Sequence, residues 1–289
     1  MAKSIFLAAP SNASDALFRA WGKALSDAMT EVGFTKTADT GQIDWSSVLA
    51  PAAISTYQGY EIRAFSDSLQ ATNPVYLKIE YGSSSPSAGI PGIRYTIGKA
   101  TDGAGELVGE MSADRIISAS GASATTYTTY VSGSTDRLSF CIFRNYTYNA
   151  IFIIERTKNS SGANTSVGID IVHSSKNSSG NPETYQQFLP KSGLRYPYSN
   201  YVGCCCAFPY NPTTAVYGDT IGLFPIFTLI GGAQFPNLGG LVYFSGDIAA
   251  NTDLSITIFG SAHTYKTTGT SLSAINGNAA VKSIAMRYE

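Results

Sequence analysis

LSFCIFRNYTYNAIFIIERT, residues Leu138–Thr157, is the densest apolar region of the chain. Two runs within it, Leu138–Phe143 and Ala150–Ile154, are rich in β-branched and aromatic residues, which favour strands. The polar tetrad Asn145–Tyr148 between them suits a short connection, so the stretch predicts an antiparallel hairpin. Both runs are nearly continuous rather than alternating, which predicts side chains covered on both faces. We therefore expect this hairpin to lie in the core.

Strand patterns occur on both sides of the hairpin. Gly59–Phe65 and Val75–Tyr81 alternate apolar with polar residues, which predicts strands with one face in water. Ile93–Ile97 follows as a further strand, so the three predict a meander. After the turn at Asn159–Asn164, Val167–Val172 predicts a third strand in the sheet of the hairpin. Strands are also expected near both ends of the chain, at Ser4–Ala8, Leu241–Asp247, Leu254–Phe259 and Val281–Tyr288.

One helix is predicted, at Ser14–Val32. Asn12 or Ser14 can cap its start, and Gly33 ends it. Its apolar stripe recurs at helical spacing and contains Leu17, Trp21, Leu25, Ala28, Met29 and Val32. We expect the stripe to dock on the protein's own β body, leaving the opposite face available for assembly. A polar connection, Thr35–Ala50, links the helix to the first sheet.

The pattern predicts a mainly β fold, a β-sandwich or jelly-roll-like body with one N-terminal amphipathic helix. Beyond the turn at Lys176–Pro182 the composition shifts to an irregular, proline-rich segment, with prolines at positions 190, 197, 209, 212, 225 and 236. We interpret residues 1–289 as one β-rich domain. The alternative is a subdivision near residues 185–195 into a β body and a Tyr/Pro-rich C-terminal part.

The composition bears on the partners. Only 13% of the 289 residues are charged, against about 25% in average globular proteins. The net charge of -1 provides no attraction to nucleic acid or to an anionic membrane, so neither is an expected partner. No apolar run reaches the roughly 18 residues that span a bilayer. Low charge with many hydroxyl side chains suits a β protein that contacts other protein surfaces.

Four cysteines are present. Cys141 lies in the predicted hairpin, where a free thiol behaves as a small hydrophobic group. Cys204, Cys205 and Cys206 are consecutive, so on a strand their side chains alternate between faces and do not converge on one metal ion. Structural thiols are the favoured interpretation, with a disulfide or inter-subunit bridge as the alternative. No metal site is predicted.

No catalytic constellation and no cofactor site is found in the sequence. The only histidines, His173 and His263, lie outside any nucleophile motif. The glycine groups at 103–105 and 231–232 do not begin a helix, so they are interpreted as turns rather than phosphate cradles. Asp67, Asp102 and Asp219 lie beside Gly or Ser, where capping and turn formation explain them. We predict that the protein is not an enzyme.

Tyrosines cluster in the irregular segment, at Tyr196, Tyr198, Tyr201, Tyr210 and Tyr217. A tyrosine combines a rigid apolar ring with a hydrogen-bonding hydroxyl group, so such a region suits protein contact or stacking on sugar rings. An ordinary loop that covers its own sheet is the third interpretation. These five residues are the predicted interface or sugar-stacking site.

Three segments resemble virion structural proteins of tailed bacteriophages: Gly59–Ser84, Tyr95–Gly109 and Phe140–Gly162. The resemblance covers roughly the middle third of the chain. It implies a subunit without a catalytic role that is made in the cytoplasm of a host bacterium and assembles there into a symmetric particle.

The expected function is therefore that of a structural subunit of a phage virion, from the tail, baseplate or neck. Its expected partners are other virion proteins and further copies of itself in a homo-oligomer. A capsid decoration protein is one alternative. The other is a carbohydrate- or receptor-binding module of a tail tip or fibre, which would bind a host surface glycan.

Overall fold

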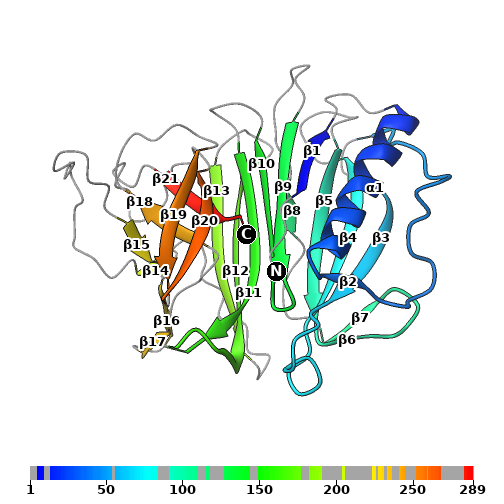
Figure 1. Cartoon of the computed structure of the whole chain (residues 1–289). Coiled ribbons are helices and arrows are strands. Elements are labelled where there is room, and N and C mark those ends of the chain that lie inside the picture. The colour runs from blue at the N-terminus through cyan, green and yellow to red at the C-terminus, as the bar shows by residue number, and fades with distance from the viewer. Residues whose placement is uncertain are drawn as a thin grey trace.

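The computed structural model describes residues 5–9, 14–53, 56–83, 91–109, 115–117, 127–143, 149–159, 161–176, 182–190, 204–205, 223–225, 227–230, 233–235, 241–244, 252–258, 260–267 and 283–288. This part of the chain is mostly β, with one helix and antiparallel sheets (Figure 1). The coarse prediction of a mainly β protein with an N-terminal helix is confirmed.

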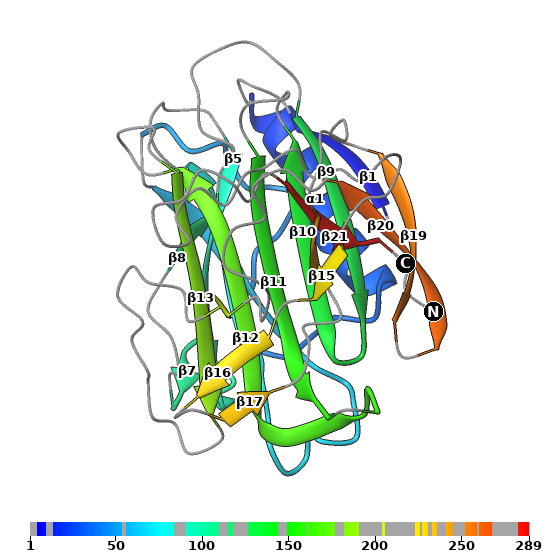
Figure 2. The same cartoon turned by 90° about the vertical axis from the view of Figure 1, so that its left-hand side faces the viewer.

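The central sheet has six antiparallel strands in the order β1-β9-β10-β11-β12-β13 (Figure 2). They are β1 (Ile5–Ala9), β9 (Tyr127–Ser134), β10 (Arg137–Phe143), β11 (Asn149–Lys158), β12 (Asn164–Lys176) and β13 (Pro182–Pro190). The predicted hairpin is the pair β10–β11, with Leu138 opposite Ile154 and Phe140 opposite Phe152. The predicted third strand is β12, which pairs with β11. The strand β13 was not predicted.

The N-terminal sheet has five antiparallel strands in the order β2-β3-β4-β5-β8. They are β2 (Thr35–Lys36), β3 (Tyr57–Ala64), β4 (Tyr76–Ser83), β5 (Pro91–Gly98) and β8 (Arg115–Ile117). The consecutive pairing of β3, β4 and β5 confirms the predicted meander. A two-stranded ribbon, β6 (Ala100–Thr101) and β7 (Leu107–Val108), follows β5. Gly103 and Gly105 have positive φ angles of 80° and 108° in the ribbon's turn, as the turn interpretation requires.

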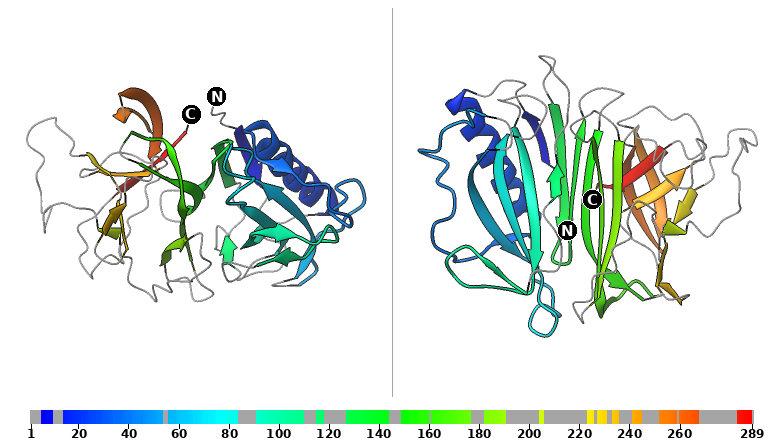
Figure 3. Two further views of the ribbon diagram at one scale, coloured as in Figure 1. Left: turned by 90° about the horizontal axis from the view of Figure 1, so that it is seen from below. Right: turned by 180° about the vertical axis from the view of Figure 1, so that it is seen from behind.

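The C-terminal sheet has the order β15-β18-β21-β20-β19. Its strands are β15 (Leu223–Pro225), β18 (Leu241–Phe244), β21 (Ser283–Arg287), β20 (Ser261–Thr267) and β19 (Asp253–Ile258). A small three-stranded sheet contains β14 (Cys204–Cys205), β16 (Phe227–Ile230) and β17 (Ala233–Phe235). The central sheet lies between the N-terminal and the C-terminal sheet (Figure 3).

The helix α1 spans Asp15–Glu31. Ser14 caps it by accepting a hydrogen bond from the Leu17 backbone N–H, and Gly33 follows with a φ of 94°. Trp21, Leu25 and Met29 are buried against the protein's own sheets, as expected. The expectation for Leu17 was wrong, because its side chain is 48% exposed and Phe18 is buried instead.

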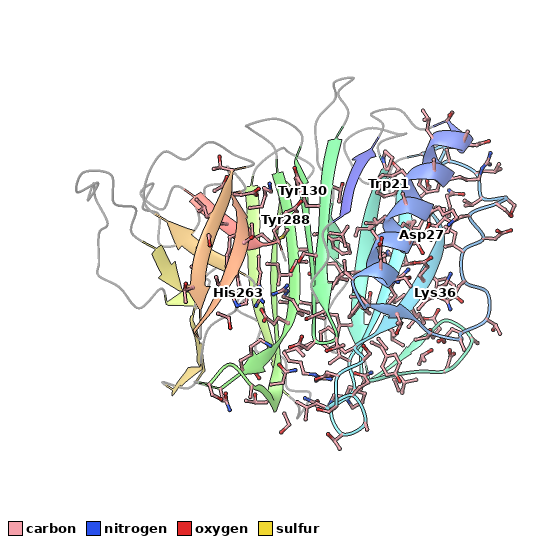
Figure 4. The ribbon with its side chains drawn as sticks, in the orientation of Figure 1. Trp21, Asp27, Lys36, Tyr130, His263 and Tyr288 are labelled. Carbon is pink, nitrogen blue, oxygen red and sulfur yellow. The ribbon has the colours of Figure 1, made fainter. Side chains whose placement is uncertain are left out.

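One hydrophobic core joins α1, the N-terminal sheet and the central sheet. Tyr95 of β5 and Phe152 of β11 meet across it with ring centroids 4.4 Å apart. Along the central hairpin, Leu138 and Phe140 enter this core, while Ser139 between them is also fully buried. Ser139 faces the opposite side of the sheet from Leu138 and Phe140. On that side the Tyr130 ring of β9 packs against the ring of Tyr288, which follows β21, with ring centroids 5.5 Å apart (Figure 4). Both faces of the hairpin are therefore covered, as its continuous apolar pattern predicted.

Candidate functional site

The most complete polar site of the described residues lies between α1 and β3 and contains two fully buried ionised side chains. Glu61 and Arg63 of β3 both have an exposed fraction of 0%. Side chains two apart on a strand share a face, and here that face is shared with Leu77 and Ile79 of β4. The alternation of apolar and polar residues in β3 predicts a strand whose polar face lies in water. That interpretation was wrong, because the polar residues point into the core under α1.

Glu61 accepts three hydrogen bonds at each carboxylate oxygen. At Oε1 the donors are Ser26 Oγ at 2.7 Å, Lys36 Nζ at 3.2 Å and Trp45 Nε1 at 3.2 Å. At Oε2 the donors are Arg63 Nε at 3.2 Å, Arg63 Nη2 at 2.9 Å and Tyr81 O–H at 3.0 Å. A carboxylate offers about four lone-pair positions, so this one is saturated.

Arg63 is satisfied in the same way by groups of α1 and its C-terminal end. Its Nη1 donates to Thr30 Oγ1 at 3.0 Å and to the Phe34 carbonyl at 2.7 Å. Its Nη2 donates to both the carbonyl and the hydroxyl of Ser26, each at 2.8 Å. A buried guanidinium requires such partners because removing it from water is costly.

The protonation states follow from the surroundings. Burial raises the pKa of the Glu61 carboxyl, but the Arg63 charge and the hydrogen bonds from Ser26 and Arg63 lower it further, to a value below the ordinary 4.5. Burial and the Glu61 charge raise the pKa of Tyr81 well above 10. At neutral pH Glu61 is therefore a carboxylate and Tyr81 a neutral donor.

Trp45 completes the site from the segment interpreted as a polar connection. Its indole ring lies 4.8 Å from the Tyr81 ring and 5.9 Å from the Phe18 ring, while its N–H donates to Glu61. Trp21 of α1 and Lys36 of β2 lie on the same side of the molecule (Figure 4). The segment therefore packs on the core instead of simply linking two elements.

A second buried ion pair ties the N-terminal sheet to the central sheet. Arg156 of β11 donates through Nε to Asp67 Oδ2 at 2.6 Å and through Nη1 to the Asn73 carbonyl at 2.9 Å. The Arg156 side chain is 0% and the Asp67 side chain 5% exposed. The interpretation of Asp67 as a residue of a turn or cap was therefore incomplete. For Asp102 it is confirmed, because its carboxylate accepts from the Ala104 and Glu106 N–H groups.

The predicted tyrosine site, Tyr196, Tyr198, Tyr201, Tyr210 and Tyr217, lies outside the described residues, as do Cys206 and Asp219. Cys204 and Cys205 lie on β14, opposite Thr228 and Phe227. His263 lies on β20, and Arg287 Nη2 is 2.7 Å from its Nδ1. Because arginine only donates, this nitrogen accepts, and the ring carries its proton on Nε2.

Within the described ranges, no group of three or more His, Cys, Asp and Glu side chains is placed to hold a metal ion. In the same part of the chain, no helix has the length and apolar character needed to cross a bilayer. Comparison of the chain with known family models and with curated protein sequences found no match.

The Glu61 site is thus an anchor rather than a reaction centre. A general base needs a lone pair that faces substrate, and both oxygens of Glu61 are occupied by donors of the protein itself. Its partners come from α1, β2, β3, β4 and the Trp45 segment, so one carboxylate fixes five parts of the chain. The arrangement can hold a helix on a sheet in one position.

Proposed function

We propose that the protein is a non-enzymatic structural subunit of a tailed-bacteriophage virion, from the tail, baseplate or neck, that assembles through protein contacts. The observation that carries the proposal is the Glu61 site. It uses two buried charges to fix α1 on the N-terminal sheet. A particle needs subunits that all present the same surface, and a fixed helix serves that need.

The architecture supports the same proposal at a finer level. The N-terminal and central sheets share one core, and Tyr95 and Phe152 meet across it. We propose that these two sheets form a β-sandwich. A sandwich presents loops and strand edges at its rim, which suits repeated contacts between copies.

The start of α1 offers a surface for such contacts. Leu17 is 48% and Leu49 60% exposed. Two hydrogen bonds hold the segment of Leu49 along the first turns of the helix, from Arg19 to the Val48 carbonyl at 3.0 Å and from the Ala50 N–H to Asp15 at 2.8 Å. Leu17 and Leu49 are therefore two exposed apolar side chains near the start of α1, and each would lose water if a second copy bound over it.

Size-exclusion chromatography with light scattering over a range of concentrations tests the assembly. We expect oligomers, and we expect the double variant Leu17→Ser, Leu49→Ser to shift them toward monomer. Val108→Ser is the matched control, because Val108 is 50% exposed on β7. A strictly monomeric protein at high concentration that is also absent from purified particles would refute the proposal.

The carbohydrate-binding alternative depends on Tyr198, Tyr201 and Tyr210, which lie outside the described residues. Titration with host surface polysaccharide separates it from the structural proposal. Binding that is lost in Tyr→Ala variants at these positions would favour the alternative, together with a role at a tail tip or fibre.

A further inference from the structure

A lysine, an asparagine and an aspartate meet where β11 ends and β12 begins. Lys158 and Asn164 are direct partners in the β11–β12 register. The Lys158 Nζ lies 2.7 Å from the Asn164 Oδ1 and 2.5 Å from the Asp136 Oδ2. The side chains of Lys158 and Asp136 are only 12% and 14% exposed. An amine and a carboxamide are thus held together in a mostly dry place.

Asp136 lies beside both reacting groups. It is in the β9–β10 turn and pairs with the Lys158 ammonium group, and the Asn164 side chain is near enough to help lower the pKa of its carboxyl. Its other oxygen accepts from Ser134 Oγ, which fixes the carboxylate. The Asn164 Nδ2 also donates to Asp67 at 3.2 Å, so the carboxamide is oriented as well.

The Asn159 side chain accepts hydrogen bonds from two backbone N–H groups between the two strands. Asn159 Oδ1 accepts from the Ser161 N–H at 3.0 Å and from the Ala163 N–H at 2.9 Å. This holds Lys158 and Asn164 in register without help from the amine. Because a carbonyl bond is about 1.2 Å long, the Lys158 Nζ lies within about 4 Å of the Asn164 Cγ. That is close to the separation of a near-attack geometry.

We propose that Lys158 and Asn164 form an intramolecular isopeptide bond, with Asp136 as the acid and base. Lys158 first gives a proton to Asp136, and its neutral Nζ then adds to the Asn164 Cγ. Asp136 returns this proton to Nδ2, which leaves as ammonia when the Cγ–Nδ2 bond breaks. The extra proton on Nζ passes to Asp136 and from there to the ammonia. The product is a secondary amide and an ammonium ion, and no oxidant or other co-reactant is needed.

The ion pair between Lys158 and Asp136 explains why the reaction has a barrier. Burial raises the pKa of Asp136, but the Lys158 charge and the hydrogen bonds from Lys158, Ser134 and Asn164 lower it further, to about 2. The resting state is therefore ammonium and carboxylate, and the proton transfer is uphill. Glu155 lies 3.6 Å from the Lys158 Nζ and adds to the negative charge beside it.

The bond would be independent of the proposed virion function, but it would suit a particle. It would close the β11–β12 hairpin covalently at the loop, beside the β9–β10 turn. Denaturants could not separate Lys158 from Asn164 afterwards. The register of two strands of the central sheet would thus be fixed permanently.

Intact-mass spectrometry of the purified full chain tests the proposal. We expect the main species to lack about 17 Da relative to the sequence, the mass of one ammonia. Proteolysis should release one branched peptide that contains both Lys158 and Asn164. The variants Lys158→Arg and Asn164→Ala should have their full sequence mass. Lys78→Arg is the matched control, because Lys78 pairs with Glu106 at 3.0 Å outside this site, and it should still lack ammonia.

Asp136→Asn tests the assigned proton transfer. We expect this variant to keep its full mass, with a far-ultraviolet circular dichroism spectrum like that of the parent. A wild-type chain that retains its full mass after prolonged incubation would overturn the proposal. So would a loss of ammonia that persists in Lys158→Arg, because a succinimide at an asparagine also loses ammonia without a lysine.

Discussion

Removing the charge of Glu61 should destabilise the protein far more than removing an exposed carboxylate. Glu61→Gln keeps the shape of the side chain but leaves Arg63, which has an exposed fraction of 0%, without its counter-ion. Breaking a buried ion pair by removing one partner costs about 3–5 kcal/mol. The new side-chain amide would also place an N–H₂ group where Glu61 now accepts six hydrogen bonds, and an N–H₂ group cannot accept them. We therefore expect Glu61→Gln to lower the free energy of unfolding by about 3–5 kcal/mol.

Urea unfolding followed by tryptophan fluorescence measures this loss directly. The chain has only two tryptophans, and Trp45 donates to Glu61 while Trp21 packs on Tyr81 at 6.3 Å. Both therefore report on this site. Glu106→Gln is the matched control, since Glu106 is 78% exposed in its pair with Lys78 and should contribute less than about 1 kcal/mol.

A double replacement separates the cost of an unpaired charge from the value of the pair. Glu61→Leu with Arg63→Met removes both charges, and such apolar replacements of buried pairs are often neutral or stabilising. We expect the double variant to be more stable than Glu61→Gln. A Glu61→Gln loss below about 1 kcal/mol, with an unchanged dependence on urea, would refute the anchoring role derived from the geometry.

Three further outcomes are expected, each measured by urea unfolding. Gly22→Ala, which usually stabilises a helix, should destabilise this one by about 1–3 kcal/mol, because the new Cβ would lie 2.0 Å from a Trp45 ring carbon. Tyr81→Phe should cost about 1–3 kcal/mol through the lost bond to Glu61. The lowered pKa values of Glu61 and Asp136 provide stability that is complete above their unfolded values of 4.5 and 3.8. The part from Asp136 is lost as the pH falls toward its folded pKa of about 2, and the part from Glu61 is lost below its unfolded value. Equal stability at pH 6 and pH 3 would contradict this.

The helix and the central hairpin could be predicted from sequence because their signals are local. Ser14 and Gly33 mark the ends of α1, and the apolar runs of β10 and β11 flank a short polar connection. The strand β13 was missed because Pro182 and Pro190 at its ends suggested an irregular segment. Prolines at strand ends are compatible with an edge strand, which is the position of β13 in the central sheet.

The Glu61 site was missed because alternation assigns residues to two faces without saying which face is buried. In β3 the apolar Ile62 points away from the main core, and Glu61 and Arg63 point into it. A signal was present in the helix. Ser26 lies between Leu25 and Met29 on the buried side of the helix, so its hydroxyl group needed a buried polar partner.

The pair of Asp67 and Arg156 could not be found in one sequence, since its members are 89 residues apart. Nothing local to Asp67 distinguishes a residue that caps a turn from one that pairs with a distant guanidinium. The same holds for Asp136 and Lys158, which meet only when the β9–β10 turn and the end of β11 are brought together.

Two buried ion pairs, Glu61 with Arg63 and Asp67 with Arg156, lie at junctions between elements, which indicates what they contribute. Glu61 joins α1 to the N-terminal sheet, and Arg156 of the central sheet joins the loop between β3 and β4. Such pairs add little net stability compared with apolar residues, but any alternative packing would leave a charge buried without a partner. We infer that they select one arrangement of helix and sheets. If so, the Glu61→Leu, Arg63→Met variant should fold with normal stability and yet assemble into less uniform oligomers, which light scattering would detect. Uniform assembly by that variant would show that apolar packing alone fixes the helix.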